Sequence, residues 1–387
     1  MFRRLIQIAL RECGIMRRNP IYGFCMVVFP VVMIIFFTSL MQEGVPTDMP
    51  VGVVDQDNSS TSRALVRKLD AFQTTRITGH YKDVSEARRA IQRNEIYAFL
   101  YIPEGTEAGL MASRQPKVSF YYSSVSLAAG SLLMRDLKTV STLGSAAVGM
   151  KKLSALGKTS EEIATFLQPI AVDLHMVGNP YANYNYYLSS VMLPGVIMVF
   201  IFLITPYSIG TELKFRTAKQ LMRMAGNNPY VAIAGKVLPQ TLIFLVIMYG
   251  FEFYIYYVLK FPHPGGVVPI LLLGLLSVLA CQCFGIFVFG LIPSLRLAMS
   301  VCSLWSVVSF SICGATFPIF AMDSPVTAMG QLFPMRHYYM IYQMNIFNGF
   351  PLSEAVLHWG ALVLFCALPL LTVWNIRKVM REYEYLP

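Results

Sequence analysis

Asp55 and Asp57 form the most suggestive acidic pair in the chain, because they follow an apolar run that is predicted to be a strand. A strand that ends in D-x-D could bind calcium or begin a phospho-aspartate hydrolase. An EF-hand calcium loop needs Gly at position 60 and Glu at position 66, where the chain has Ser60 and Val66. A hydrolase prefers Thr or Val after the second aspartate, and here Asn and Ser follow. We therefore expect a turn whose side chains accept backbone hydrogen bonds and cap the next helix.

A nucleotide site and a metal site both lack support. Residues 157–159 read Gly-Lys-Thr, like the end of a P-loop, but that motif needs Gly where the chain has Lys152. Cys281 and Cys283 have neither a second pair nor a nearby histidine, so we expect apolar residues of a span. The histidines are scattered: His80, His175, His263, His337 and His358. No nucleophilic triad stands out, so we expect no catalytic residue, metal or cofactor in this chain.

Glu252 is the one charged residue inside a predicted membrane span. An acid in that position is by default a candidate for a proton or cation site. It lies toward the outer end of its span among several tyrosines, so an interfacial acid in an aromatic belt explains it equally well. Both interpretations stay open.

The composition indicates a membrane protein. Of 387 residues, 55% are hydrophobic and only 13% are charged, and the mean hydropathy is +0.54. Soluble domains carry about 25% charged residues, which argues against a soluble enzyme, a disordered chain and a fibrous repeat. Six apolar runs have the length of about 20 residues that crossing a bilayer requires. They are Ile21–Met41, Tyr187–Tyr207, Val237–Leu259, Val267–Leu291, Leu297–Phe320 and Ala355–Trp374.

Basic residues orient these spans. Five Lys or Arg precede the first span, five lie between the second and third, one lies between the fourth and fifth, and three follow the sixth. If the spans alternate, these segments share one face, which the positive-inside rule makes cytoplasmic. Residues 42–180 hold 15 basic and 14 acidic residues, which nearly cancel. The net charge of +10 therefore marks topology and contact with anionic membrane lipid rather than nucleic acid. We expect both termini in the cytoplasm.

The predicted fold is an α-helical integral membrane protein with six transmembrane helices and an α/β extracytoplasmic domain between spans one and two. Residues 1–20 form a cytoplasmic amphipathic helix, and residues 21–41 form the first span. Residues 42–180 form the outer domain, and residues 181–387 form the other five spans. Within the outer domain, strands are expected at 50–55, 96–102 and 118–122, helices at 60–72 and 84–93, and helix-like sequence at 126–170.

Two segments between spans have unusual compositions. Residues 211–225 mix charged and apolar side chains and stop at Gly-Asn-Asn-Pro, which predicts a short amphipathic helix parallel to the membrane. Residues 321–353 are too apolar for an ordinary loop. There we expect a re-entrant segment of short helices that dip partly into the outer leaflet and pack on protein.

Together these pieces resemble the membrane permease subunit of type 2 ABC exporters, in a subgroup with a large outer domain after the first span. Val51–Ser59 resembles the VVDxDNS segment of that subgroup. Glu212–Leu221 resembles the coupling segment E-(R/K)-x-x-G-T-x-x-Q-L, with Arg216 where that segment has Gly. Residues 333–338 resemble the F-P-x-x-(H/W)-(Y/F) segment before the last span. The resemblance covers nearly the whole chain.

The resemblance implies an exporter of drugs, lipids or other amphipathic substrates in the bacterial inner membrane. It implies that two such subunits pair, identical or paralogous, and that each docks on a separate cytoplasmic ABC ATPase, which binds ATP and Mg. A periplasmic adaptor and an outer-membrane channel are further possible partners. It places ATPase coupling at Arg4, Arg11, Glu212, Lys214, Arg216, Thr217, Gln220 and Leu221, and an outer gate at Phe333, Pro334, His337 and Tyr338.

Polar residues of the spans are candidates to line a transport path. They are Asn185, Thr205, Glu252, Ser306, Ser309 and Thr316, although helix-packing hydrogen bonds explain them equally well. Other functions stay open. A proton-coupled secondary transporter would need paired buried charges or inverted repeats. A membrane-anchored receptor would act through residues 42–180, and a membrane hydrolase would use Asp55 and Asp57.

Overall fold

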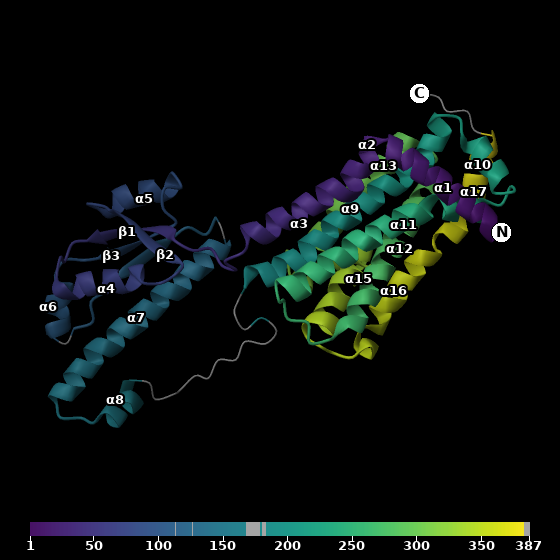
Figure 1. Ribbon diagram of the computed structural model, residues 1–387. Coiled ribbons are helices and arrows are strands. Elements are labelled where there is room, and N and C mark those ends of the chain that lie inside the picture. Colours follow the sequence, from purple (N-terminus) through teal and green to yellow (C-terminus); the bar gives the residue numbers. More distant parts are fainter. Residues whose placement is uncertain (113, 126, 168–178, 180–182, 383–387) are drawn as a thin grey trace. The chain divides into compact units, whose positions relative to one another are not determined.

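The computed structural model describes residues 1–112, 114–125, 127–167, 179 and 183–382 (Figure 1). The chain forms two compact units, one built from Met1–Gln42 with Asn183–Pro387 and the other from Glu43–Ala182. We call them, after the placement that the sequence predicts, the membrane unit and the outer unit, and each is described by itself.

The membrane unit is helical in its regular structure. Its elements are α1 (Phe2–Arg18), α2 (Pro20–Gly23), the π-helical η1 (Phe24–Val28), α3 (Phe29–Leu40), α9 (Tyr184–Lys214), α10 (Ala218–Met224), α11 (Pro229–Phe253), η2 (Tyr254–Val258), α12 (Val267–Leu291), α13 (Leu295–Ile312), η3 (Ile319–Ala321), α14 (Ser324–Gly330), α15 (Pro334–Ile341), η4 (Tyr342–Phe347), η5 (Leu352–Ala355), α16 (Val356–Ala367) and α17 (Pro369–Glu382). Six helical stretches of the described chain are long and apolar enough to cross a membrane, as the sequence predicted.

The bounds of these stretches differ from the predicted spans, and the largest differences concern the second, third, fifth and sixth. The sixth runs to Glu382, eight residues past the predicted end at Trp374. The second continues to Lys214, and the third begins at Pro229, eight residues before the predicted start at Val237. The fifth was predicted to reach Phe320 but ends at Ile312. The chain breaks there because Gly314 takes a positive φ of 107°, a conformation that a helix cannot continue through.

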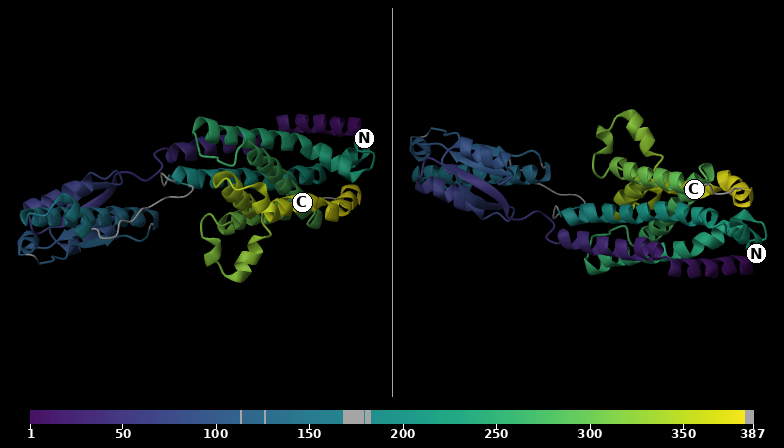
Figure 2. Two further views of the ribbon diagram at one scale, coloured as in Figure 1. Left: turned by 90° about the horizontal axis from the view of Figure 1, so that it is seen from below. Right: turned by 90° about the horizontal axis from the view of Figure 1, so that it is seen from above.

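α12 is the central helix of the membrane unit, because it contacts α9, α11, α13, α16 and α17. The core between these helices is aromatic and aliphatic, with fully buried Phe202, Phe244 and Phe289. The amphipathic α1 lies along α11 (Figure 2). Its buried residues Ile8, Glu12 and Met16 recur every four positions and so share one face.

The outer unit is an α/β domain with a four-stranded sheet. The strand order is β2-β1-β3-β4, with β1 parallel to both β2 and β3 and with β4 antiparallel to β3. The strands are β1 (Met49–Asp55), β2 (Thr75–His80), β3 (Ala98–Ile102) and β4 (Ser119–Tyr122). The helices are α4 (Ser60–Asp70), α5 (Val84–Gln92), α6 (Thr106–Met111), α7 (Leu127–Ala155) and α8 (Ser160–Leu167). The predicted strands and helices are confirmed. Within the predicted helix-like segment 126–170, residues 126 and 168–170 lie outside the described residues.

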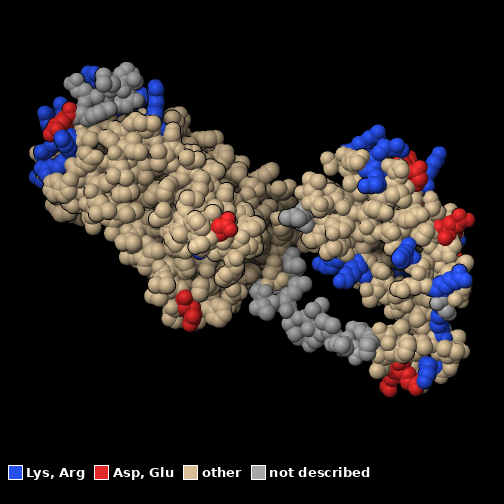
Figure 3. Space-filling view, turned by 180° about the vertical axis from the view of Figure 1, so that it is seen from behind, with Lys and Arg blue, Asp and Glu red and all other residues tan. Residues whose placement is uncertain are grey.

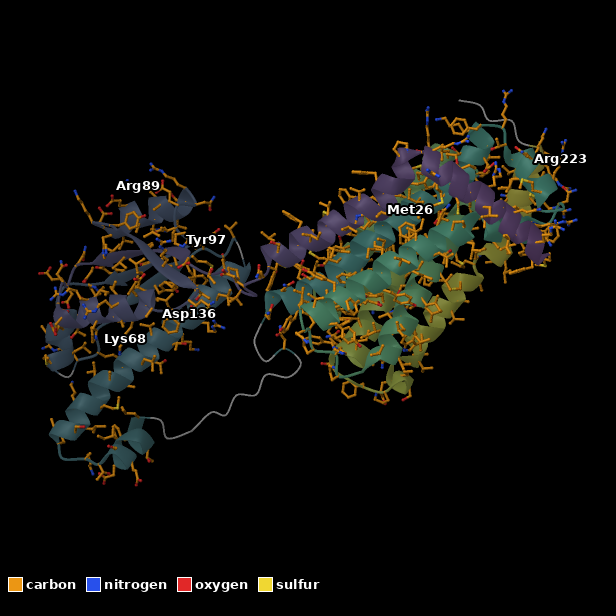
Figure 4. All side chains as sticks on the ribbon, in the orientation of Figure 1. Met26, Lys68, Arg89, Tyr97, Asp136 and Arg223 are labelled. Atoms are coloured by element: carbon orange, nitrogen blue, oxygen red, sulfur yellow. The ribbon has the colours of Figure 1, made fainter. Side chains whose placement is uncertain are left out.

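Helices cover both faces of this sheet. Leu69 of α4 and Leu133 of α7 share one apolar cluster with Val51 of β1, whereas Ala87 of α5 packs with Phe99 in a second cluster. On α7, the buried Asp136 accepts a hydrogen bond from Thr74 just before β2 (Figure 4). This contact fixes α7 against the edge strand.

The Asp55 turn is the cap that the sequence predicted. Asp55 Oδ1 accepts from the backbone N–H of Asp57 at 3.1 Å and of Asn58 at 3.0 Å. Its Oδ2 accepts from Ser62 Oγ at 2.6 Å, and Ser59 with Ser62 forms a capping box at the start of α4. Asp57 Oδ2 accepts from the Glu107 backbone N–H at 3.2 Å, so both acids have hydrogen-bond donors from the protein itself.

Candidate functional site: a buried charge network in the membrane unit

Lys236 is buried inside α11, which begins before the predicted third span. Asn228 caps the helix, its Oδ1 accepting from the backbone N–H of Tyr230 at 3.0 Å, and Pro229 occupies the first helical turn. Lys236 thus lies two turns inside the helix rather than in a loop, and its side chain is 1% exposed.

α1 approaches α11 closely at Gly235. A Cβ at this position would lie 2.9 Å from the Ile8 Cβ and 3.1 Å from the Leu5 carbonyl oxygen. The missing side chain lets the two helices come together, and this brings Glu12 of α1 beside Lys236.

Two carboxylates share the Lys236 ammonium. Lys236 Nζ lies 2.6 Å from Glu12 Oε2 and 2.8 Å from Glu212 Oε1. Arg11 adds a bidentate pair, with Nη1 at 2.7 Å from Glu212 Oε1 and Nη2 at 3.0 Å from Oε2. Two acids therefore meet two bases, and the formal charges cancel in a site where Glu12, Lys236 and Glu212 are at most 2% exposed. Such compensation is what a buried charge requires.

Neutral polar groups complete the network. Ser208 Oγ donates to Glu12 Oε1 at 3.2 Å, and Gln240 Nε2 donates to Ser208 Oγ at 2.7 Å. Thr217 Oγ1 donates to Glu212 Oε2 at 2.5 Å. We call these seven residues the charge network: Arg11, Glu12, Ser208, Glu212, Thr217, Lys236 and Gln240. It joins α1, α9, α11 and the turn before α10.

The turn between α9 and α10 has a left-handed residue at its centre. Arg216 has φ +57°, where the related coupling segment carries Gly. The Thr217 backbone N–H donates to the Glu212 carbonyl at 2.9 Å and closes the turn. The sequence predicted one short helix over 211–225. Instead, α9 itself runs through Lys214 and the short helix is only α10 (Ala218–Met224), so Glu212 belongs to the long helix.

The structure brings some predicted coupling residues together and leaves others apart. Arg11, Glu212 and Thr217 meet in the charge network. Arg4 packs on Gly226, where a Cβ would lie 2.0 Å from its Nη1. Lys214 lies 5.7 Å from the ring centre of Phe215. Gln220 is exposed on α10 and Leu221 is fully buried beneath it.

Four members of the network were not predicted from the sequence: Glu12, Ser208, Lys236 and Gln240. One signal was present. The Asn-Asn-Pro before Tyr230 is a helix start as well as a stop, and it would have placed Lys236 within the third span. Glu212 likewise lies inside a long helix, so Glu252 is not the only charge in the spanning helices. The pairing of Glu12 with Lys236 depends on tertiary contact and had no local signal.

This end of the membrane unit is strongly basic. Figure 3 shows Lys and Arg side chains gathered there, and Arg223 of α10 points away from the helices in Figure 4. α10 contacts both α1 and α17 at this end. The sequence predicted that the basic segments share one face of the membrane. Their position at one end of the membrane unit fits that prediction.

The four predicted gate residues belong to a set of short helices, as expected for residues 321–353. Phe333 is buried against Trp305, with ring centres 4.6 Å apart, and Pro334 begins α15. Tyr338 is buried and stacks on Tyr342. His337 Nδ1 lies 2.9 Å from His358 Nδ1 of α16. Phe333 and His337 thus tie α15 to α13 and α16, and the role of the four residues as a gate stays a prediction.

The predicted path residues make contacts within the membrane unit. Thr205, Ser306, Ser309 and Thr316 donate to carbonyls of their own chain segments, at 2.7 to 2.9 Å. Asn185 donates to the Thr38 carbonyl at 3.5 Å. The four hydroxyl bonds are local to one chain segment, and the Asn185 bond joins α9 to α3. A path through these residues stays a prediction.

Glu252 differs from the other path candidates because it is buried without full hydrogen bonding. It is 6% exposed, and its Oε2 has no hydrogen-bond partner among the described residues. Its Oε1 occupies the space beside Gly274, where a Cβ would lie 3.0 Å away. Across the described chain, no group of three or more His, Cys, Asp or Glu is placed to hold a metal ion.

A helical bundle with six candidate membrane helices defines a multi-pass membrane protein. The chain belongs to the ABC-2 family: the model of the ABC-2 family transporter protein matches residues 21–374. No curated protein matches the chain. Permeases of this family are typically non-catalytic membrane subunits, and the family implies a partner ATPase subunit.

Proposed function

We propose that this chain is the permease subunit of an ATP-driven exporter in a bacterial inner membrane, with both termini in the cytoplasm. A separate ABC ATPase binds ATP and Mg, and a second permease subunit, identical or paralogous, completes the transporter. The family match and the basic end of the membrane unit support this assignment. Drugs, lipids or other amphipathic molecules are the proposed substrates.

The charge network is the observation that carries the coupling mechanism. α1 and α10 lie at the basic end, where a cytoplasmic ATPase would dock. Arg11 and Glu12 of α1 are bonded to Glu212 of α9 and Lys236 of α11. A displacement of α1 or of the α9–α10 turn therefore pulls directly on two spanning helices. Because a buried ion pair cannot separate without leaving uncompensated charge, these helices move together.

In this mechanism, binding of ATP by the motor shifts α1 and α10, and the network transmits the shift to α9 and α11. α9 also packs on α12 and α13, so the shift reaches the middle of the bundle. The outer unit is proposed to face the periplasm and to contact an adaptor protein that leads to an outer-membrane channel.

The test is the separation of ATP hydrolysis from export. Glu212→Ala removes the shared carboxylate, and Arg216→Glu reverses a charge in the turn. Both variants should keep the ATPase bound and hydrolysing ATP, while export across a panel of amphipathic compounds falls by about tenfold or more, equivalent to 1.4 kcal/mol of lost coupling. Arg296→Ala, an exposed basic residue outside the network, is the matched control and should export normally. Wild-type export by both variants would refute the mechanism.

A proton-coupled secondary transporter is the second candidate, and the buried Glu252 favours it. An acid with an unpartnered oxygen in a spanning helix could carry a proton. Glu252→Gln distinguishes the two. A proton-driven transporter would lose uptake driven by a pH gradient, whereas an ATP-driven one would still respond to ATP alone.

A further inference from the structure

A cavity of about 650 Å³ lies among α12, α13, α15 and α16, away from the charge network. Its volume is in the range of about 300–1,000 Å³ that small-molecule sites occupy. Most of its wall is apolar, with Phe284, Phe287 and Leu364 as examples. Polar groups come chiefly from Gln331, His337 and His358, which also line it.

The hydrogen-bond partners of the two histidines define which ring nitrogen of each carries the proton. His337 Nε2 lies 2.9 Å from the Gln331 carbonyl oxygen, which can only accept, so Nε2 carries the proton. In neutral His337, Nδ1 is then an acceptor. His358 Nδ1, 2.9 Å away, must donate to it. His358 Nε2 is left as an acceptor.

A permanent positive charge lies next to this pair. Arg336 is 4% exposed, and among the described residues no carboxylate forms an ion pair with it. With the Gln331 amide oxygen turned toward it, Arg336 donates from Nε at 3.2 Å and from Nη2 at 3.1 Å. Its Nη1 is buried and unpartnered. Gln331 thus contacts both the guanidinium and His337, so the polar end of the cavity lies beside a buried cation that lacks a counterion.

The surroundings add no acid to the cavity wall. The lining residues from α12, α13, α15 and α16 include no Asp or Glu. Glu354 lies four residues before His358, but it is exposed and the structure records no ion pair between them. An apolar chamber with an uncompensated positive end is complementary to a molecule with an apolar tail and a negative head.

We propose that this cavity binds a single-chain anionic amphiphile, with its carboxylate at the Gln331–His337–His358 end and its hydrocarbon tail along Phe284, Phe287 and Leu364. The head supplies the counter-charge that Arg336 lacks. A head that arrives as the carboxylic acid donates its O–H to the free Nε2 of His358. The proposal concerns binding by this chain alone and does not depend on coupling to an ATPase.

Tryptophan quenching can test the proposal on the purified full-length protein, because Trp305 lines the cavity. Dibromostearate is added in mild detergent, and quenching is measured for the wild type and for Trp305→Phe. The expected result is saturable quenching that oleate reverses and that Trp305→Phe largely loses. Oleyl alcohol and oleylamine have the same tail as oleate but no carboxylate. They should therefore compete with dibromostearate more weakly than oleate does, by about tenfold or more.

Variants separate the tail site from the head site. Ala361→Phe fills the cavity and should abolish saturable quenching. Gly360→Phe adds the same side chain at the adjacent position, which faces open space, so this variant should bind dibromostearate normally. Arg336→Gln should weaken oleate about tenfold and leave oleyl alcohol unchanged, while Arg336→Lys keeps part of the preference. Thermal unfolding of each variant shows whether it is folded.

Three results would overturn the proposal. Equal competition by oleate, oleyl alcohol and oleylamine would mean that charge is not recognised. Wild-type quenching by Ala361→Phe would place the ligand elsewhere. Stronger competition by dioleoyl phosphatidylglycerol than by oleate would assign the cavity to a two-chain anionic membrane lipid instead.

Discussion

At the scale of single residues, Lys236 is the least replaceable member of the charge network, because it contacts both carboxylates. Lys236→Met leaves Glu12 buried without its cation, and loss of one partner of a buried pair costs about 3–5 kcal/mol. We expect a large drop in the unfolding temperature of the purified protein in mild detergent.

A double variant separates lost charge balance from lost packing. Adding Glu12→Gln to Lys236→Met removes the stranded carboxylate, so part of the lost stability should return, with an interaction energy of about 0.5–3 kcal/mol. Lys214→Met, which removes an exposed lysine beside Phe215, should change stability by less than about 1 kcal/mol. Strictly additive losses in the double variant would contradict the paired geometry.

Arg216 provides a second residue-scale prediction, because its φ of +57° strains any residue with a Cβ. Arg216→Gly should leave stability unchanged or raise it by up to about 1 kcal/mol. Arg216→Val should lower it by more than that, since a β-branched residue fits this conformation poorly. The same thermal unfolding assay measures both. Equal effects of Gly and Val would show that the left-handed turn is not maintained.

At the scale of elements, the outer unit holds α4 and α6 together through a partly exposed acid. Glu107 of α6 accepts from Thr61 Oγ1 at 2.8 Å and from Ser60 Oγ at 2.9 Å. These two hydrogen bonds lower the pKa of Glu107 below its ordinary value, the bond from Thr61 more than that from Ser60. Because the folded pKa is the lower one, the stabilisation is present above the unfolded value of about 4.3 and is lost as the pH falls through the folded value.

Hydrogen exchange of the full chain can measure this effect. After correction for intrinsic rates, the first turns of α4 and α6 should lose protection as the pH is lowered from about 5 to about 3. Glu107→Gln should show little of this pH dependence. Glu104→Gln, a change at a neighbouring exposed acid, should keep it. An unchanged pH profile in Glu107→Gln would assign the effect to another group.

Elements with a strong local pattern were predictable from sequence, and those defined by tertiary contact were not. The six apolar runs and the buried strands at 50–55 and 96–102 carry their own signal. β2 was missed because Thr75–His80 is a polar edge strand, whose backbone pairs with β1 but whose side chains are only partly covered. The end of the fifth span was misplaced because apolar sequence continues past Gly314, where the backbone turns.

The residues of the candidate site also divide into those that could be predicted from the sequence and those that could not. Arg11, Glu212 and Thr217 could be selected from the coupling segment and the basic face of the first helix. Glu12 and Lys236 could not, because each is an ordinary charged residue until Gly235 allows α1 to approach α11. Arg336 and the His337–His358 pair likewise acquire their meaning only from the packing of α15 on α16.

At the scale of the whole molecule, the proposed coupling requires an ATPase that docks at the basic end of the membrane unit. The family implies such an ATPase subunit. The proposed role of the charge network depends on this partner, since without a motor nothing would displace α1 and α10.

A pull-down from the native membrane tests this requirement most directly. The tagged chain is purified in mild detergent, and every co-purifying protein is identified and quantified by mass spectrometry. We predict a soluble protein with a complete P-loop motif in stoichiometric amount, retained by wild type and by Glu212→Ala alike. A stable chain that purifies without any such ATPase would contradict the account and make Glu252 and proton coupling the first alternative to examine.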